Sequence, residues 1–204
     1  MIYSSSVFLI SPANMSGIRG TRLLDEAGKT DVHARLKGEG VELGKLFTFV
    51  SSLYFRGKLA YGNAFGKTSS GRPGVYIITP GAGLISPETR VTQQELRAIC
   101  RTEIDPNNEL FCRPLENDIR RLRETCKGSR FVLLGSIATP KYIEPLMRAL
   151  DGDLFYPSAF LGRGDMSRGS LLLNCVRTQV ELDYVRPEPP ATHSKRPRKR
   201  SSSQ

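Results

Sequence analysis

The sequence predicts an α/β protein of three layers, α/β/α, around a mainly parallel central sheet. Short apolar or β-branched segments alternate along the chain with amphipathic segments of helical period, which is typical of a parallel sheet with helical crossovers. The segment 131–134 is apolar at every position, as expected for a strand that helices cover on both faces. The chain has 204 residues, of which 39% are hydrophobic, enough for one core.

The first half of the chain contains two expected strands and one long helix. Residues 7–11 form an apolar strand, followed by a loop rich in Gly, Pro and Asn. Residues 41–65 carry apolar side chains at helical spacing, and Gly57 and Gly62 are expected to break this helix into pieces. Residues 75–79 form a β-branched strand.

In the second half, Thr92 and Glu95 form a capping box that opens a helix ending near Ile99. Strands and helices then alternate to the end of the domain, and Pro140 suits the first turn of one of the helices. The expected helices are 115–126, 140–150 and 166–176, and the expected strands are 131–134, 154–156 and 180–185.

The chain divides into a single α/β domain, residues 1–186, and a basic tail, residues 187–204. The formal net charge is +10, and the tail holds five basic residues against one acid, so the domain itself stays basic. The tail is rich in Pro and Ser and almost free of apolar residues, so we expect it to be disordered. It is either a solvated terminus or an electrostatic arm for nucleic acid.

Composition also limits the cellular setting and the chemistry. No run reaches the roughly 20 apolar residues of a membrane helix, and the apolar segment 7–10 is too short for a signal peptide. The four cysteines have no CxxC spacing, and the chain has two histidines, which favours reduced thiols over a zinc site. We therefore expect a cytoplasmic monomer with no metal, no cofactor and no membrane contact.

Small polar residues follow four of the expected strands, at 11–17, 79–83, 135–139 and 157–169. Ligands of open α/β sheets bind beyond the carboxyl ends of the strands, so these segments predict one shared crevice. The last segment, 157–169, has the highest concentration of groups that could bind a ligand. Asp165 within it can cap the next helix or face the crevice. Arg163 and Arg168 in this segment can bind phosphate. An Asp165 helix cap with two surface arginines is an alternative interpretation of the same residues.

Aromatic and basic residues interleave at Tyr54, Arg56 and Lys58, a pattern that suits base stacking and phosphate contact. A core tyrosine beside solvated cations is an equally good interpretation.

The chain resembles the uracil-DNA glycosylase superfamily in layout. The resemblance is carried by Ile10-Ser11-Pro12-Ala13-Asn14, by Leu134-Gly135-Ser136-Ile137-Ala138 and by Tyr156-Pro157-Ser158. It implies that Asn14 positions the hydrolytic water. The last loop of that family usually reads His-Pro-Ser, and Tyr156 in place of the histidine argues against uracil as the substrate.

The chain is also similar to the YaaA-like peroxide-stress proteins and to small domains found near base-exchanging transglycosylases. Their opening matches Ile10-Ser11-Pro12-Ala13, and their middle strand resembles Ile77-Ile78-Thr79 through Gly83-Leu84-Ile85-Ser86-Pro87. That family is associated with DNA binding, so both resemblances imply a nucleic-acid partner.

From the residues and the resemblances together, we expect a DNA glycosylase that flips a damaged or modified base, other than plain uracil, out of DNA. It would hydrolyse the N-glycosidic bond and leave an abasic site, with Asp165 stabilising charge on the sugar and Asn14 orienting water. No lysine is marked as a Schiff-base nucleophile, although Lys58 and Lys141 remain open for a lyase step. The expected substrate-binding residues are Ser11, Pro12, Tyr54, Gly81, Gly83, Ser136, Tyr156, Ser158 and Phe160. The expected contacts to the nucleic-acid backbone are Arg56, Lys58, Arg163, Ser167, Arg168, Lys195, Arg196, Arg198, Lys199 and Arg200.

Two other classes of function stay open. One is a non-catalytic DNA-binding stress-response protein, and the other is an enzyme like a nucleoside deoxyribosyltransferase, which acts on free nucleosides. Asp165 in the crevice and released from capping would favour catalysis, whereas Asp165 satisfied as a cap would favour the binding protein. The partner DNA would be single-stranded DNA or modified phage DNA, and the setting either DNA repair or antiviral defence.

Overall fold

A computed structural model describes residues 3–68, 71 and 73–188. Its central sheet has six strands in the order β4-β3-β1-β6-β7-β8. The four inner strands are parallel: β3 (Val75–Ile78), β1 (Ser5–Ile10), β6 (Ser129–Leu134) and β7 (Leu154–Pro157). The edge strands β4 (Leu84–Ile85) and β8 (Tyr184–Val185) pair antiparallel to their neighbours.

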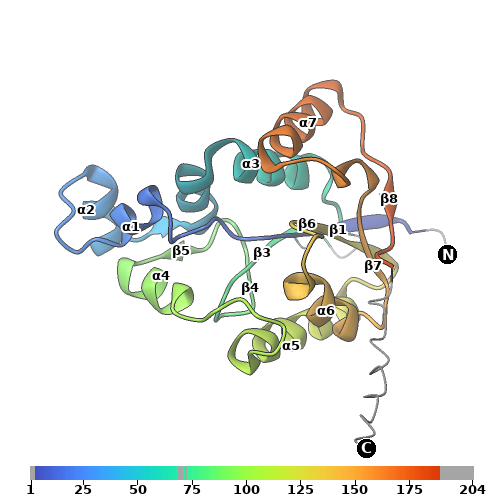
Figure 1. The fold of residues 1–204 in the computed structure, drawn as a ribbon, viewed down its shortest axis with the longest axis horizontal. Helices are drawn as coiled ribbons and strands as arrows, with labels where there is room; N and C mark the ends of the chain where they lie inside the picture. Colours follow the sequence, from blue (N-terminus) through green and yellow to red (C-terminus); the bar gives the residue numbers. More distant parts are fainter. Residues whose placement is uncertain (1–2, 69–70, 72, 189–204) are drawn as a thin grey trace, which may run out of the picture.

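Helices cover both faces of this sheet, which confirms the predicted three-layer α/β/α fold (Figure 1). On one face α3 (Leu43–Phe65) packs against α7 (Asp165–Thr178), and on the other α5 (Glu109–Thr125) packs against α6 (Pro140–Ala149). The central strand β1 serves both cores, because Phe8 and Ile10 point into one apolar cluster and Val7 and Leu9 into the other.

The order of the parallel strands reverses at β1. The chain leaves β1 through α3 and enters β3 on one side, whereas it leaves β6 through α6 and enters β7 on the other. The carboxyl ends of β1 and β6 therefore lie at the topological switch point, where the connections diverge and open a crevice. Ser11 extends the pairing at this point, because its N–H donates to the Leu134 carbonyl at 3.1 Å.

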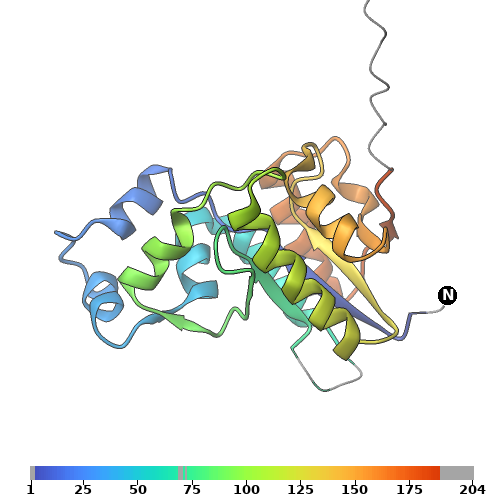
Figure 2. The same cartoon turned by 90° about the horizontal axis from the view of Figure 1, so that it is seen from below.

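A smaller group of elements lies beyond the carboxyl end of β1 (Figures 1 and 2). It contains α4 (Gln93–Cys100), the short strands β2 (Val41–Glu42) and β5 (Arg90–Val91), and two helices that were not predicted, α1 (Ile18–Leu24) and α2 (Asp31–Lys37). Isolated helices of seven residues are only marginally stable in water, so tertiary contacts must stabilise α1 and α2. His33 supplies one such contact, since its ring nitrogens bond the Thr30 hydroxyl and the Arg22 carbonyl.

The prediction that Gly57 and Gly62 break the long helix is wrong. The helix runs through both glycines and is kinked instead at Ser51 and Ser52, where Ser52 takes φ 35°. The two glycines serve close packing: a Cβ on Gly57 would lie 2.8 Å from the Gly169 carbonyl oxygen of α7, and one on Gly62 would lie 2.9 Å from a Val75 methyl group.

Other boundaries differ where a local signal was absent or misleading. Helix α5 begins at Glu109, capped by Asn108, and includes Pro114, whereas the sequence placed its start at residue 115. The last strand covers only Tyr184–Val185, because α7 ends at Thr178, the next residue, Gln179, takes the left-handed conformation, and an irregular segment follows. The capping box of Thr92 and Glu95 is confirmed.

Within the described residues, no helix is long and apolar enough to cross a membrane. Residues 189–204 lie outside the described part of the chain. The predictions for the tail, including Lys195, Arg196, Arg198, Lys199 and Arg200, therefore stay predictions.

Candidate active site

A cleft of about 530 Å³ opens at the carboxyl ends of the strands, where the sequence placed a crevice. The loop after β1, the kinked region of α3, the loop after β6, and the first turns of α6 and α7 all contribute to its wall. The predicted site residues that line it are Ser11, Pro12, Asn14, Tyr54, Lys58, Ser136 and Asp165. The structure thus brings both expected catalytic residues to one cavity.

Lys58 forms part of the cleft lining, yet only 2% of its surface is exposed. Its Nζ donates to the Ser11 carbonyl oxygen at 2.7 Å and to the Ser11 Oγ at 2.8 Å. The amine also lies 4.5 Å from the centre of the Tyr54 ring. Burial lowers the pKa of Lys58 to about 7, against a weaker opposite effect from the charge of Asp165.

Tyr54 presents a buried hydroxyl in the same cavity. The Arg168 guanidinium lies close enough to lower the pKa of this hydroxyl by its charge and by a loose side-chain contact, but within the described residues no group forms a hydrogen bond of normal geometry with the hydroxyl. Burial raises the pKa of Tyr54 to about 12, so the hydroxyl keeps its proton near neutrality and remains a donor. An unpaired buried hydroxyl is costly, which indicates that a ligand or water completes it.

Asp165 lies in the first turn of α7 and is not the cap of that helix, because Gly164 occupies the N-cap position. Its side chain is 71% exposed, and one carboxylate oxygen lies 3.7 Å from the Arg168 guanidinium. Asp165 therefore lines the cleft with Arg168 as its single ionic partner among the described residues. By the criterion set out above, this position favours a catalytic role over simple capping.

Asn14 lies in the exposed loop after β1. Its side-chain oxygen accepts hydrogen bonds from the Ser16 N–H at 3.1 Å and from the Ser16 hydroxyl at 2.6 Å, which forms an Asx turn. The side-chain oxygen of Asn14 therefore already accepts two hydrogen bonds from within its own loop. The side-chain amide nitrogen can still donate a hydrogen bond to a water molecule.

Several cleft residues were not among the expected site residues, although Lys141 was left open for a lyase step. Lys141 and Tyr142 enter from the first turn of α6, and Cys100, Thr102 and Glu103 enter from the end of α4 and the loop after it. The first pair directly follows a strand-end loop, so extending that rule by three residues would have found them. The other three follow a helix and carry no such signal. Burial raises the pKa of Cys100 to about 11, which leaves it a poor nucleophile.

Some predicted substrate-binding residues lie outside the cleft. Gly81 is packed against Thr102, and Gly83 against Asp118 and Pro114. Tyr156 is buried in β7, and the hydroxyl of Ser158 donates to the Asp183 carbonyl. Phe160 is fully buried in the core, with its ring 6.5 Å from that of Tyr54, so it supports the cleft from behind.

The predicted phosphate-binding residues divide into two groups. Lys58 and Arg168 are buried, and Arg168 donates from Nε and Nη2 to the Phe160 carbonyl at 3.2 and 3.0 Å. The expectation that these two cations grip phosphate is therefore wrong, because their heads face protein acceptors. Arg56, Arg163 and Ser167 are exposed outside the cleft lining, with Arg163 donating to the Ser167 hydroxyl.

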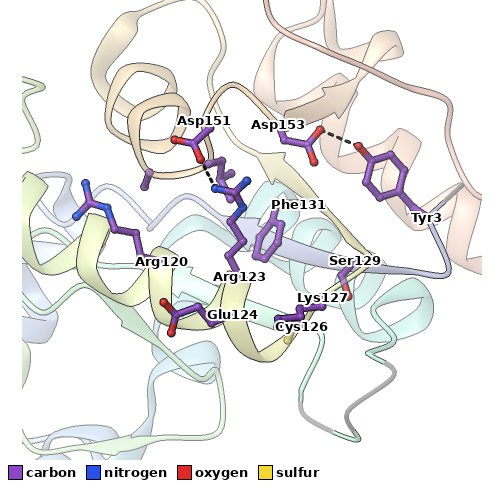
Figure 3. A pocket seen from close by; sticks show the side chains of 13 residues that line it. Tyr3, Arg120, Arg123, Glu124, Cys126, Lys127, Ser129, Phe131, Asp151 and Asp153 are labelled. Atoms are coloured by element: carbon purple, nitrogen blue, oxygen red, sulfur yellow. Dashed lines mark hydrogen bonds and ion pairs between the residues drawn. The ribbon is translucent and has the colours of Figure 1, made fainter. Parts of the chain in front are cut away.

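A second hollow, of about 490 Å³, lies at the opposite end of the sheet, near the start of β6 (Figure 3). Some of its polar groups pair with one another: Arg123 bonds Asp151, and Tyr3 donates to Asp153 at 2.7 Å (Figure 3). Asp153 also accepts from Arg186. Because this hollow lies away from the topological switch point, the cleft at the carboxyl ends is the stronger candidate.

Across the described residues, no three His, Cys, Asp or Glu side chains are grouped closely enough to hold a metal ion. No protein-family model, curated protein or solved structure matches this chain. What the cleft can bind and do is therefore derived from its own side chains.

Proposed function

We propose that this protein is a DNA glycosylase that hydrolyses the N-glycosidic bond of a damaged or modified base flipped out of DNA, and leaves an abasic site. The observation that carries the proposal is the meeting of Asn14 and Asp165 in one cleft beside a buried tyrosine. These residues come from opposite ends of the domain sequence, and the strand order brings them to the same switch point.

The electrostatics of the cleft suit this reaction. Breaking an N-glycosidic bond develops positive charge on the sugar and negative charge on the departing base. The Asp165 carboxylate can stabilise the sugar, and its ion pair with Arg168 restrains its position. The Tyr54 hydroxyl is a buried donor with no partner in the described structure, so it can bond the edge of the base.

The dimensions of the cleft also fit one flipped nucleotide. Ligand cavities usually measure roughly 300–1,000 Å³, and this one is about 530 Å³. Tyr54 and Tyr142 line the cavity with a small part of their surface exposed and can contact a base there, whereas Phe47 is fully buried behind them.

The proposal is tested with a panel of single-stranded and duplex DNAs that carry uracil or an oxidised, alkylated, hydroxymethylated or glucosylated base. Alkali treatment after incubation converts abasic sites into breaks. We expect alkali-dependent cleavage of one substrate, which would also separate a repair role from anti-phage defence. Salt-sensitive binding to every DNA with no abasic sites would instead indicate the non-catalytic binding protein. Losses of less than about threefold in both Asn14→Ala and Asp165→Ala would refute the site assignment.

A free nucleoside is the second candidate substrate. It is favoured by the burial of Lys58 and Arg168, which removes two of the cations expected to contact a DNA backbone. The bond broken is the same, and the acceptor is a second base instead of water. Incubation of deoxynucleosides with a different free base tests it, because base exchange would produce a new nucleoside.

A further inference from the structure

The amine of Lys58 is buried in the cleft without a counter-ion. Its two hydrogen-bond acceptors are both uncharged oxygens of Ser11, and among the described residues no carboxylate lies within ion-pair distance of it. The aromatic rings of Tyr54 and Phe55 lie 4.5 and 5.2 Å away. Such rings stabilise an ammonium ion by about 1–2 kcal/mol, which is less than the several kcal/mol that burial of an uncompensated ion costs.

The environment therefore favours the neutral amine. Burial lowers the pKa of Lys58 to about 7, so a large fraction of the molecules carry a nitrogen lone pair at neutral pH. Two N–H groups of a neutral amine suffice for the two bonds to Ser11, which leaves the lone pair uncommitted. A desolvated lysine of this kind is a nucleophile toward carbonyl carbon.

We propose that Lys58 forms an imine with the aldehyde carbon of an abasic deoxyribose held in the cleft. The inference rests on the proposed function in that the abasic sugar is its product. The Nζ lone pair attacks the C1′ aldehyde carbon, and an amine proton moves to the former carbonyl oxygen. That oxygen takes a second proton from solvent and leaves as water, so the product is a protonated C1′=Nζ imine.

The cleft contains the residues that imine formation requires. Ser11 fixes the amine at the carboxyl end of β1, and the low exposure of Lys58 limits competition by bulk water. Asp165 approaches from α7, near enough for its charge to act on Lys58 but not paired with it. Its negative charge would stabilise the protonated imine that replaces the neutral amine.

The test uses the full chain and duplex DNA in which the abasic site has been formed beforehand by a different enzyme. Sodium borohydride delivers hydride to the imine carbon and converts the adduct into a stable secondary amine. We expect a protein–DNA adduct that depends on borohydride, and peptide mapping of the wild-type adduct should place it on Lys58. The mapping does not depend on whether a variant folds.

Lys58→Met should lower the adduct yield by about tenfold or more, because methionine fills similar space without an amine. Lys45→Met is the matched control, since Lys45 lies on the same helix, exposed and paired with Glu42. Absence of an adduct, an adduct mapped to another lysine, or an equal yield from Lys58→Met would each overturn the inference.

The two proposals fail separately in these experiments. Because the abasic site is formed in advance, adduct formation does not require base removal by this protein. An adduct at Lys58 without base release from the panel would refute the glycosylase alone. Base release without an adduct at Lys58 would refute only the imine and leave Lys58 as a cross-link between α3 and β1.

Discussion

The Lys58 amine donates hydrogen bonds to both the carbonyl and the hydroxyl oxygens of Ser11, at 2.7 and 2.8 Å. Ser11 is held in turn by the sheet, through its N–H bond to Leu134 at the end of β6. The second part of α3 is thereby attached to the switch point of the fold. The position of the amine in the cleft is consequently set by the most buried strands of the protein.

Replacing Lys58 should change the pH dependence of stability. The pKa of Lys58 is about 7 in the folded protein and 10.5 in its ordinary state, so between these values the unfolded chain binds a proton that the folded chain does not. Wild-type stability should therefore rise relative to Lys58→Met by roughly 1.4 kcal/mol per pH unit from pH 7 to pH 10. Urea unfolding of both proteins at several pH values measures this difference.

The comparison with Lys58→Met cancels the titration of the other cleft groups, which both proteins share. Those groups are Tyr54, Cys100, Glu103, Lys141, Tyr142 and Asp165. A stability difference that stays constant from pH 7 to pH 10 would show that Lys58 is charged in the folded protein.

Removal of two buried tyrosine hydroxyls should have opposite effects. Tyr54→Phe deletes a hydroxyl with no hydrogen-bond partner among the described residues, so stability should stay the same or rise by about 1 kcal/mol. Tyr61→Phe should cost about 1–3 kcal/mol, because the Tyr61 hydroxyl accepts from the Leu182 N–H at 2.8 Å and bonds Tyr184 at 2.6 Å. Denaturant unfolding compares the two variants directly.

Tyr54→Phe should also weaken substrate binding by about tenfold, since a hydrogen bond to the bound base would be lost. The DNA that the panel identifies as substrate provides the measurement. A Tyr54→Phe protein that is less stable than wild type but binds that DNA equally well would show that the hydroxyl has an internal partner.

Asp165→Asn should lower the rate of base release by about 100-fold or more and leave stability within about 0.5 kcal/mol of wild type. The side chain is 71% exposed and has only its ion pair with Arg168, so its loss does little to the folded state. Single-turnover kinetics with excess protein isolates the chemical step. Asp31→Asn is the control, because Asp31 is an exposed acid in the first turn of α2. If both substitutions lowered the rate of base release equally, the reduced rate would result from the change in net charge and not from the position of Asp165 in the cleft.

Gly57→Ala should destabilise the protein by about 1–3 kcal/mol. Alanine normally gains about 1 kcal/mol over glycine inside a helix, but its Cβ would lie 2.8 Å from the backbone oxygen of Gly169. The clash outweighs the gain because backbone on a packed helix cannot move alone. Gly164→Ala is the control, since a Cβ added there would have no atom within 4 Å and the φ of Gly164 is −79°. A stabilised Gly57→Ala protein would mean that α3 and α7 separate readily.

The layered fold could be predicted because its signals are local. The continuous apolar segments of β1 and β6 depend only on neighbouring residues, and both strands form at the expected places. The continuity of α3 through its two glycines accompanies close contacts with distant segments, which no local pattern shows. The sequence alone suggests that Gly57 and Gly62 interrupt the helix. In the structure these glycines allow Gly169 and Val75 to pack closely against it.

The site was predictable only in part, for the same reason. The rule for strand ends found Ser11, Asn14, Ser136 and Asp165. It also selected Gly81, which packs against the loop after α4, and Gly83, which packs against α5. Lys58 carried no local sign of burial, because a lysine between Gly57 and Leu59 in a helix normally faces solvent. Its environment arises from β1 and α7, which lie far away in the sequence.

Salt dependence should distinguish a DNA substrate from a free nucleoside. The buried Lys58 and Arg168 cannot release counter-ions from DNA, so phosphate contact falls to exposed cations such as Arg163, which lies beside Asp165 at the start of α7. Each phosphate contact contributes about 0.9 to the slope of log affinity against log salt concentration. Arg163→Ala should therefore reduce the slope by about that amount and weaken binding to all DNA sequences alike.

Arg177→Ala supplies the control for this measurement, because Arg177 is exposed in the last turn of the same helix and bonds Asn174, away from the cleft. Fluorescence anisotropy over a range of salt concentrations gives both slopes. Equal slopes for the two variants would place the DNA path elsewhere. Binding without any salt dependence, together with base exchange on free nucleosides, would assign the cleft to the smaller substrate, because a nucleoside carries no phosphate whose counter-ions could be released.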